Sequence, residues 1–170
     1  MNSNKNLVLI GMMGSGKSVI GSLLSKNLNL EFNDVDKIIE KETKSTISDL
    51  FKKEGEDYFR KLEEKFTLKL LKLQNTIISL GGGGFINYNI RNQVLKNHFS
   101  FWLNWKNSTL INRIIKSKKR PIAFNSGVDE IKKMIIDRSK IYSMANYKIN
   151  CENLSKNEIV NKIKNIYEKN

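Results

Sequence analysis

The chain has 170 residues, of which 39% are hydrophobic, so one domain is expected, and no apolar run is long enough to cross a bilayer. Its 30 Lys and Arg against 17 Asp and Glu give a formal net charge of +13 at pH 7, which favours anionic partners such as nucleic acid, acidic membranes, or phosphorylated and carboxylated small molecules. The basic residues are spread along the chain, so a general lysine bias is the simpler interpretation.

Apolar strands alternate with amphipathic helices along the chain. The expected strands are short buried runs at residues 7–10, up to about 33, 76–80, 99–103 and 147–151. The expected helices carry apolar residues three or four positions apart, at residues 19–28, about 38–39, 47–51, 59–73, 110–115, 131–142 and 159–166. This alternation predicts a parallel sheet covered on both faces, with ligands at the carboxyl ends of the strands.

The first strand runs directly into the segment "GMMGSGKS". Gly11, Gly16, Lys17 and Ser18 fit the phosphate-loop pattern, and they stand between a predicted strand and a predicted helix, as that pattern requires. Glycines let successive backbone N–H groups face phosphate oxygens, the lysine reaches the outer phosphates, and the serine hydroxyl is offered to Mg²⁺. The alternative is an accidental glycine-rich turn.

Two carboxylates follow the second strand. A GTPase would carry the guanine-reading sequence N-K-x-D, which is not found. The strand "TIISL" ends without an acidic residue, so the usual second partner of Mg²⁺ is absent at that position. Asp34 and Asp36 are therefore the nearest acidic candidates for the metal shell and for a second substrate, and we expect them to point in different directions. The alternative is a helix N-cap followed by an acidic residue of the first turn.

Glycines and two arginines add further candidates. The run 81–84 follows a strand and indicates close backbone approach to a ligand, although a flexible turn is the alternative. Arg138 falls on an apolar helix row, so it either extends towards solvent or pairs with an anion. Arg60 forms a surface ion pair on its helix or is held in a site by Glu63.

Taken together, the segments "GMMGSGKS", "DVD", "GEDYFRKLE", "SLGGGG", "KKRP" and "DRSKIY" stand in the order and spacing of shikimate kinases. The chain resembles this family from Leu7 to about Tyr167. The resemblance implies a phosphate-loop NTPase fold of the nucleoside-monophosphate-kinase type, with a five-stranded parallel sheet flanked by helices. It also implies transfer of the γ-phosphoryl group of ATP to the 3-hydroxyl of shikimate, on the route to chorismate and aromatic amino acids.

The resemblance implies a role for each matching position. Lys17, Asp36 and Arg120 would be catalytic, and Ser18 and Asp34 would hold Mg²⁺. The residues implied to contact ATP are Gly14, Ser15, Gly16, Lys17, Ser18, Val19, Arg113 (beside the adenine) and Arg120 (in the lid). The residues implied to contact shikimate are Asp36, Phe51, Phe59, Arg60, Gly82, Gly83 and Arg138.

One domain is expected over residues 1–170, with substrate-binding helices at about 36–64 and a mobile lid at about 116–127. The chain departs from the family pattern in the lid, where Ala123 and Phe124 replace leucines, and in the loop, where we expect the side chains of Met12 and Met13 to matter little. The segment after Cys151 matches weakly, and no residue role is carried over to it.

Four other residues have simpler interpretations. We expect His98 on a connection between a helix and a strand, Trp102 in the core, Trp105 past the end of its strand and partly exposed, and Arg91 solvated on a helix. Cys151 is the single cysteine, so no internal disulfide forms, and the N-terminal sequence lacks a signal-peptide pattern. A monomeric cytoplasmic protein is therefore expected, without a nucleic-acid or membrane partner.

Two alternatives remain open on the sequence. Another small-molecule kinase of the same fold, such as a gluconate kinase, would lack the glycine run combined with Arg60 and Arg138. A basic nucleic-acid-binding protein that uses ATP as a switch would bind DNA or RNA in a salt-sensitive manner, but the chain shows no basic face with interleaved aromatic residues.

Overall fold

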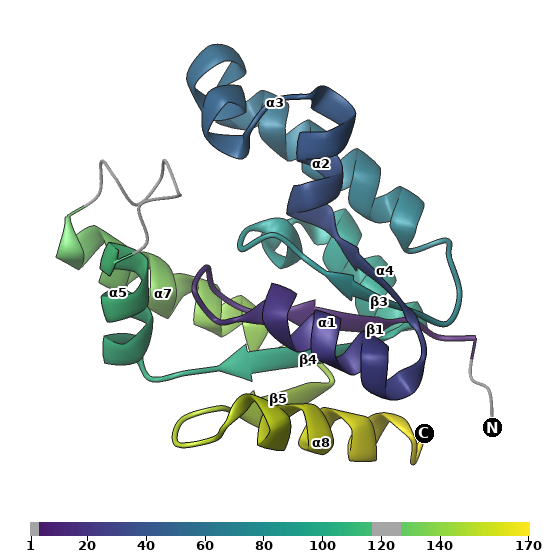
Figure 1. The fold of residues 1–170 in the computed structure, drawn as a ribbon. Helices are drawn as coiled ribbons and strands as arrows, with labels where there is room; N and C mark the ends of the chain where they lie inside the picture. Colours follow the sequence, from purple (N-terminus) through teal and green to yellow (C-terminus); the bar gives the residue numbers. More distant parts are fainter. Residues whose placement is uncertain (1–3, 117–126) are drawn as a thin grey trace.

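The structure is a computed structural model, and it describes residues 4–116 and 127–170. Five parallel strands form one sheet in the order β2-β3-β1-β4-β5 (Figure 1). The strands are β1 (Leu7–Ile10), β2 (Glu31–Asp34), β3 (Thr76–Ser79), β4 (Phe99–Asn104) and β5 (Tyr147–Asn150). Each lies within a residue or two of its predicted position, and the predicted parallel α/β fold is confirmed.

Helices cover both faces of this sheet, because alternate residues of each buried strand point to opposite sides. The helices are α1 (Lys17–Leu28), α2 (Val35–Thr43), α3 (Ile47–Leu70), α4 (Tyr88–Asn97), α5 (Asn107–Lys116), α7 (Val128–Tyr142) and α8 (Lys156–Tyr167), with a short 3-10 helix η1 (Gly84–Ile86). Leu7 and Leu9 pack under α1 and α8, whereas Val8 and Ile10 face the cluster built by α2, α3, α4, α5 and α7.

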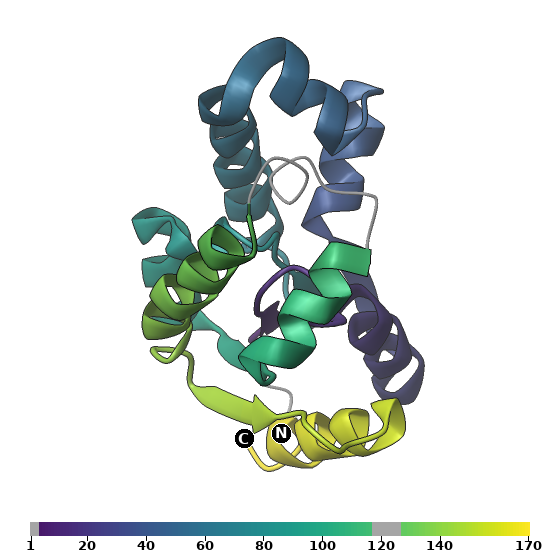
Figure 2. The same ribbon diagram turned by 90° about the vertical axis from the view of Figure 1, so that its left-hand side faces the viewer.

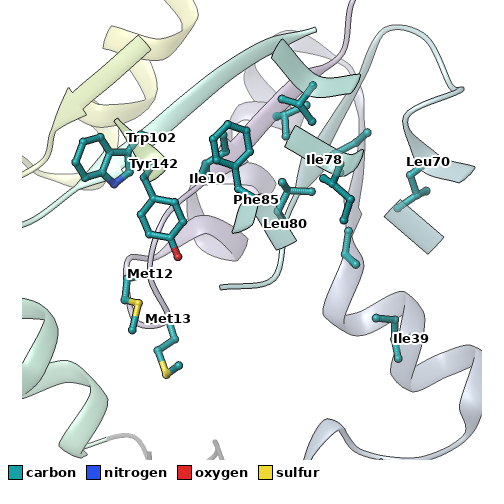
Figure 3. Close-up of a cluster of buried hydrophobic side chains, with 14 of the residues drawn as sticks. Ile10, Met12, Met13, Ile39, Leu70, Ile78, Leu80, Phe85, Trp102 and Tyr142 are labelled. Carbon is teal, nitrogen blue, oxygen red and sulfur yellow. The ribbon is translucent and has the colours of Figure 1, made fainter. Parts of the chain in front are cut away.

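The second of these clusters reaches into the phosphate-loop sequence. Met12 and Met13 are 2% and 4% exposed, and Figure 3 shows them on the hydroxyl side of Tyr142, with Trp102 on the other side of that ring. These two side chains therefore matter for packing, while the expectation that they matter little for phosphate binding stays a prediction. They extend the core to the edge of the loop, because the chain leaves β1 on the side that α7 covers.

The region between β2 and β3 differs from the prediction in detail. The helices expected at 47–51 and 59–73 form one element, α3, which is kinked where Gly55 takes the non-helical angles φ 84° and ψ 172°. Leu73 lies beyond the end of α3 and is 41% exposed, so it does not belong to the apolar stripe of the helix. α2 and the first part of α3 project away from the sheet (Figure 1).

Three of the four residues with simple interpretations lie where the sequence predicts. His98 follows α4 directly, Trp102 is buried, and Trp105 is half-buried just past β4. Arg91 is not a solvated residue, because it is half-buried and its Nη1 donates to the carbonyl oxygens of Phe85 (3.1 Å) and Ile86 (2.8 Å). Within residues 4–116 and 127–170, none of the helices combines the length and apolar character needed to span a membrane.

Candidate active site

The phosphate-loop segment lies at the carboxyl end of β1, near the middle of the view in Figure 2, with α2 and α3 on one side and α8 on the other. Gly14 and Gly16 have φ angles of 77° and 89°, in the left-handed region that favours glycine. Lys17 is 7% exposed, and its Nζ donates to the carbonyl oxygens of Gly11 (2.7 Å) and Met12 (3.1 Å). The loop backbone therefore wraps around the side chain of Lys17, which is the first residue of α1.

Ser18 and Asp34 bring two oxygen groups together beside this loop. Ser18 Oγ donates to Asp34 Oδ2 at 2.5 Å, and Asp34 is 8% exposed. Asp34 Oδ1 also accepts from the backbone N–H of Lys37 at 3.4 Å, so Asp34 is the N-cap of α2, as the alternative interpretation of the sequence had it. The other carboxylate oxygen, Oδ2, contacts Ser18, so capping the helix does not prevent Asp34 from also lying near a bound metal ion.

Asp36 points elsewhere because a helix begins between the two aspartates. Two residues that are two positions apart on a strand share a face, but Asp34 ends β2 and Asp36 lies in the first turn of α2. A Cβ atom added to Gly81 would meet Asp36 Oδ1 at 2.8 Å and would collide with Glu63 Oε1. Asp36 thus faces the glycine run, whereas Asp34 faces the phosphate loop.

Arg60 is held by two glutamates of its own helix. Its Nη1 donates to Glu63 Oε2 at 2.6 Å, and its Nε and Nη2 donate to Glu56 Oε1 at 3.1 and 2.9 Å. Glu63 is 2% exposed, so this pair is not the surface ion pair that the sequence left open. A Cβ on Gly83 would collide with the Arg60 guanidinium, which places this group directly over the glycine backbone.

Burial dominates the electrostatics of this pair. Burial raises the pKa of Glu63, an effect that the Arg60 guanidinium offsets only in part. Burial opposes the charged form of Arg60 as well, but Glu63 and Glu56 outweigh it and raise the pKa of the guanidinium. Glu63 Oε1 has no hydrogen-bond partner in the part of the chain that the structure describes, and it lies against Gly81 and Gly84.

Arg138 reaches the same glycine run from α7. Its Nη1 donates to the carbonyl oxygen of Gly82 at 3.1 Å and lies 4.0 Å from Met12 Sδ. The hydroxyl of Tyr142 donates to the same carbonyl oxygen, and burial raises the pKa of Tyr142 to about 12. Arg138 therefore does not extend towards solvent: it lines the pocket and contacts a neutral carbonyl oxygen, and its pairing with an anion stays a prediction.

These side chains line one pocket of about 630 Å³. It extends from the phosphate loop past Asp34 and Asp36 to the glycine run, and Phe51 and Phe59 form a wall with their ring centroids 4.8 Å apart. The predicted site residues that line it are Gly14, Gly16, Lys17, Ser18, Val19, Asp34, Asp36, Phe51, Phe59, Arg60, Gly82, Gly83 and Arg138. Residues from five parts of the sequence thus meet at the predicted edge of the sheet.

A second pocket of about 540 Å³ holds two of the remaining predicted residues, Ser15 and Arg113. The Arg113 guanidinium lies 3.8 Å from the centroid of the Trp105 indole, which the sequence did not assign to the site. The position of Trp105 just past a strand end was the available signal. Arg120 and the changed lid residues Ala123 and Phe124 lie outside the described residues, as does most of the predicted lid.

Known proteins match this chain over nearly its whole length. The family model for shikimate kinase matches residues 13–168. A curated shikimate kinase from Sulfurihydrogenibium sp. is 36% identical over 159 residues, which cover 94% of this chain and 95% of that protein. A solved structure of shikimate kinase from Acinetobacter baumannii in complex with shikimate superposes with a TM-score of 0.91 at 26% identity and covers 99% of this chain and 95% of that one.

The gluconate kinase alternative shares only the fold. A solved gluconokinase from Sinorhizobium meliloti superposes with a TM-score of 0.58 at 13% identity, although it covers 99% of both chains. Sequence similarity and the family model agree on one family, and it is the family that the six segments of the sequence resemble. This chain belongs to the shikimate kinase family.

Proposed function

We propose that this chain transfers the γ-phosphoryl group of ATP to the 3-hydroxyl group of shikimate, with the residues of the larger pocket in the roles given below. The observation that carries the proposal is the convergence of two guanidinium groups on adjacent glycines. Arg60 of α3 lies on Gly83, and Arg138 of α7 donates to the carbonyl oxygen of Gly82. The same pocket opens onto Lys17, so an anionic acceptor and a triphosphate fit side by side.

The two arginines suit a carboxylate substrate. A guanidinium offers several N–H donors in one plane and binds a carboxylate through paired hydrogen bonds. Glu63 and Glu56 hold Arg60 in place before the substrate arrives, and the Gly82 carbonyl oxygen holds Arg138. The site is therefore preorganised for the carboxylate of shikimate, and the rings of Phe51 and Phe59 supply an apolar wall for its carbon ring.

Asp36 is placed to act on the acceptor hydroxyl. It faces the glycine run, in the pocket that also contains Lys17. The 3-hydroxyl oxygen forms the new bond to the γ-phosphorus while the bond from that phosphorus to the bridging oxygen of ADP breaks. The hydroxyl proton passes to the Asp36 carboxylate, which orients the hydroxyl beforehand and accepts the proton late in the transfer.

The phosphate loop binds the anionic end of ATP. Backbone N–H groups and Lys17 stabilise the charge that spreads over the γ-phosphoryl oxygens during transfer. Ser18 Oγ and Asp34 Oδ2 fit a Mg²⁺ site, because they are hard oxygen groups only 2.5 Å apart and Mg²⁺ takes few protein ligands beside the phosphates. When bound, Mg²⁺ would neutralise charge on the phosphate oxygens. Arg120 belongs to the same proposal as a lid residue, on the family resemblance alone.

An ADP-release assay coupled to a reporter enzyme tests this function, with ATP, Mg²⁺ and either shikimate, gluconate or no acceptor. We expect ADP release only with shikimate, together with a product heavier than shikimate by one phosphoryl group. The Lys17→Met variant should lose turnover by orders of magnitude while remaining folded. Release that depends on gluconate would assign the chain to another substrate, and release that needs no acceptor would indicate an ATPase.

A cytoplasmic location and a monomeric state remain predictions. The alternative of a nucleic-acid-binding protein that uses ATP as a switch is not supported by any specific feature of the described residues. Its test is salt-dependent binding of the purified protein to random DNA and RNA, with shikimate-dependent turnover measured on the same sample.

A further inference from the structure

The smaller pocket lies on the other side of the phosphate loop from the acceptor site. It shares Gly16 and Val19 with the larger pocket, so the two are adjacent at the loop. Its apolar wall consists of Val19 and Ile20 of α1, Ile159 of α8, and Leu154, which lies just before α8. A triphosphate bound to the loop would therefore extend its nucleoside towards an apolar surface.

Trp105 forms one end of this pocket and is fixed in place. It follows the end of β4, is half-buried and packs against both core clusters. Its Nε1 donates to the carbonyl oxygen of Ser15 in the phosphate loop at 3.0 Å. The indole plane is thus held by packing and by a hydrogen bond to the segment that binds phosphate.

Arg113 is exposed on α5, where a long side chain would normally sample many rotamers. Instead its guanidinium lies over the Trp105 ring, with Cζ 3.8 Å from the ring centroid, and its Nη1 donates to the carbonyl oxygen of Gly14 at 3.3 Å. Guanidinium planes stack well on aromatic faces and keep their second face for another planar group. The arginine is therefore ordered towards the pocket before a ligand binds.

We infer that Trp105 is a positioning residue for the nucleobase of ATP: it supports the Arg113 guanidinium from behind so that the outer face of this group stacks on the base. This inference rests on the proposed function only in taking a nucleoside triphosphate as the ligand of the loop. The resulting order of layers is indole, guanidinium and base, opposite the apolar wall of α1 and α8. Such a site selects by stacking area, so purines should bind more tightly than pyrimidines.

Calorimetric titration separates the base from the phosphates and needs no second substrate. The ligands are ADP and CDP with Mg²⁺, and inorganic tripolyphosphate, which offers phosphates without a base. We expect Trp105→Leu to raise the Kd of ADP about tenfold, and Trp105→Phe, which keeps an aromatic plane, to raise it less than threefold. Tripolyphosphate should stay within about twofold of wild type in both variants, and the preference for ADP over CDP should shrink in Trp105→Leu.

The chain also offers a spectroscopic control, because it contains two tryptophans, and Trp102 is a buried core residue 5% exposed. A change in fluorescence on ADP binding should persist in Trp102→Phe and disappear in Trp105→Phe. Equal losses for ADP and tripolyphosphate in Trp105→Leu would overturn the inference by placing the effect in the loop through Ser15. Unchanged ADP binding in that variant would overturn it as well. If wild type binds ADP but does not phosphorylate shikimate, the proposed function fails and this inference stands.

Discussion

Glu63 and Arg60 form an ion pair of 2.6 Å on one face of α3, in which the carboxylate is almost fully buried and the guanidinium is partly open to the pocket. A buried ion pair adds little to stability, because the cost of removing both charges from water offsets their attraction. Its value here is geometric. The buried carboxylate fixes the position of a cation that faces the glycine run.

The first prediction concerns this carboxylate. Glu63→Gln keeps the shape of the side chain but removes its charge, so we expect about a tenfold weaker affinity for shikimate, or ~1.4 kcal/mol. The free energy of unfolding should fall, because the partly buried Arg60 guanidinium stays charged and loses one of its two carboxylate partners. Glu56→Gln is the matched control, since Glu56 binds the same arginine but its side chain is 56% exposed, and an exposed pair contributes only about 0–1 kcal/mol. A larger effect from Glu56→Gln would contradict the positioning role.

The second prediction concerns Arg138. Loss of one partner of a desolvated charged pair costs about 2–5 kcal/mol, so Arg138→Ala should weaken shikimate binding by roughly 30-fold to several thousand-fold. Arg138→Lys should weaken it too, because lysine lacks the planar donor fork. Arg91→Lys is the control, since Arg91 also donates to backbone carbonyl oxygens but lies outside the pocket lining. Affinity within a few-fold of wild type in Arg138→Ala would make Arg138 a support for Gly82 only.

The third prediction separates the two aspartates. Asp36→Asn removes the proton acceptor, so kcat should fall by about 10²–10⁴-fold while ATP binding persists. Asp34→Asn should instead raise the concentration of Mg²⁺ needed for half-maximal rate, because Asp34 faces Ser18. The measurement is kcat of both variants across a Mg²⁺ titration. Rescue of Asp36→Asn, but not of Asp34→Asn, by excess Mg²⁺ would reverse the two assignments.

The fourth prediction concerns pH and His98, which lies at the end of the sheet opposite the site. Its Nδ1 accepts from the backbone N–H of Asn6 at 3.3 Å, so the neutral ring is required. Burial lowers the pKa of His98, although a hydrogen bond with the Leu71 backbone opposes the shift and nearby Lys5 adds to it. The unfolded chain, with a histidine pKa of about 6.5, then binds the proton more readily than the folded chain.

Stability should therefore fall as the pH drops below about 6.5 and should level off below the folded-state pKa. Denaturant unfolding between pH 7.5 and 5 measures this slope. His98→Asn, whose amide oxygen can still accept from the Asn6 N–H, should show a flatter profile over that range. Equal slopes in both proteins would assign the acid sensitivity to other groups.

Several features follow from the sequence because neighbouring residues determine them. The phosphate loop is recognisable from Gly11, Gly16, Lys17 and Ser18, since a strand end, a tight turn and a helix start are all encoded within a few positions. The alternation of apolar strands and helices predicts the parallel sheet in the same way, and with it the edge where ligands bind. The capping box of Ser155 and Glu158 at the start of α8 is a further local feature that the structure contains.

The tertiary structure decided the features that depend on distant parts of the chain. Periodicity could not tell whether Arg138 extends into solvent, because the Gly82 carbonyl oxygen that it contacts lies 56 positions away. It could not show that Glu63 is buried, because the glycine run, which follows α3 and β3, covers that carboxylate. Trp105 and Arg113 lie close together in the sequence, before and within α5, but only the fold places them beside the Ser15 and Gly14 carbonyl oxygens. Local sequence specifies backbone shape, whereas the burial and pairing of a charge are set by which elements meet across the sheet.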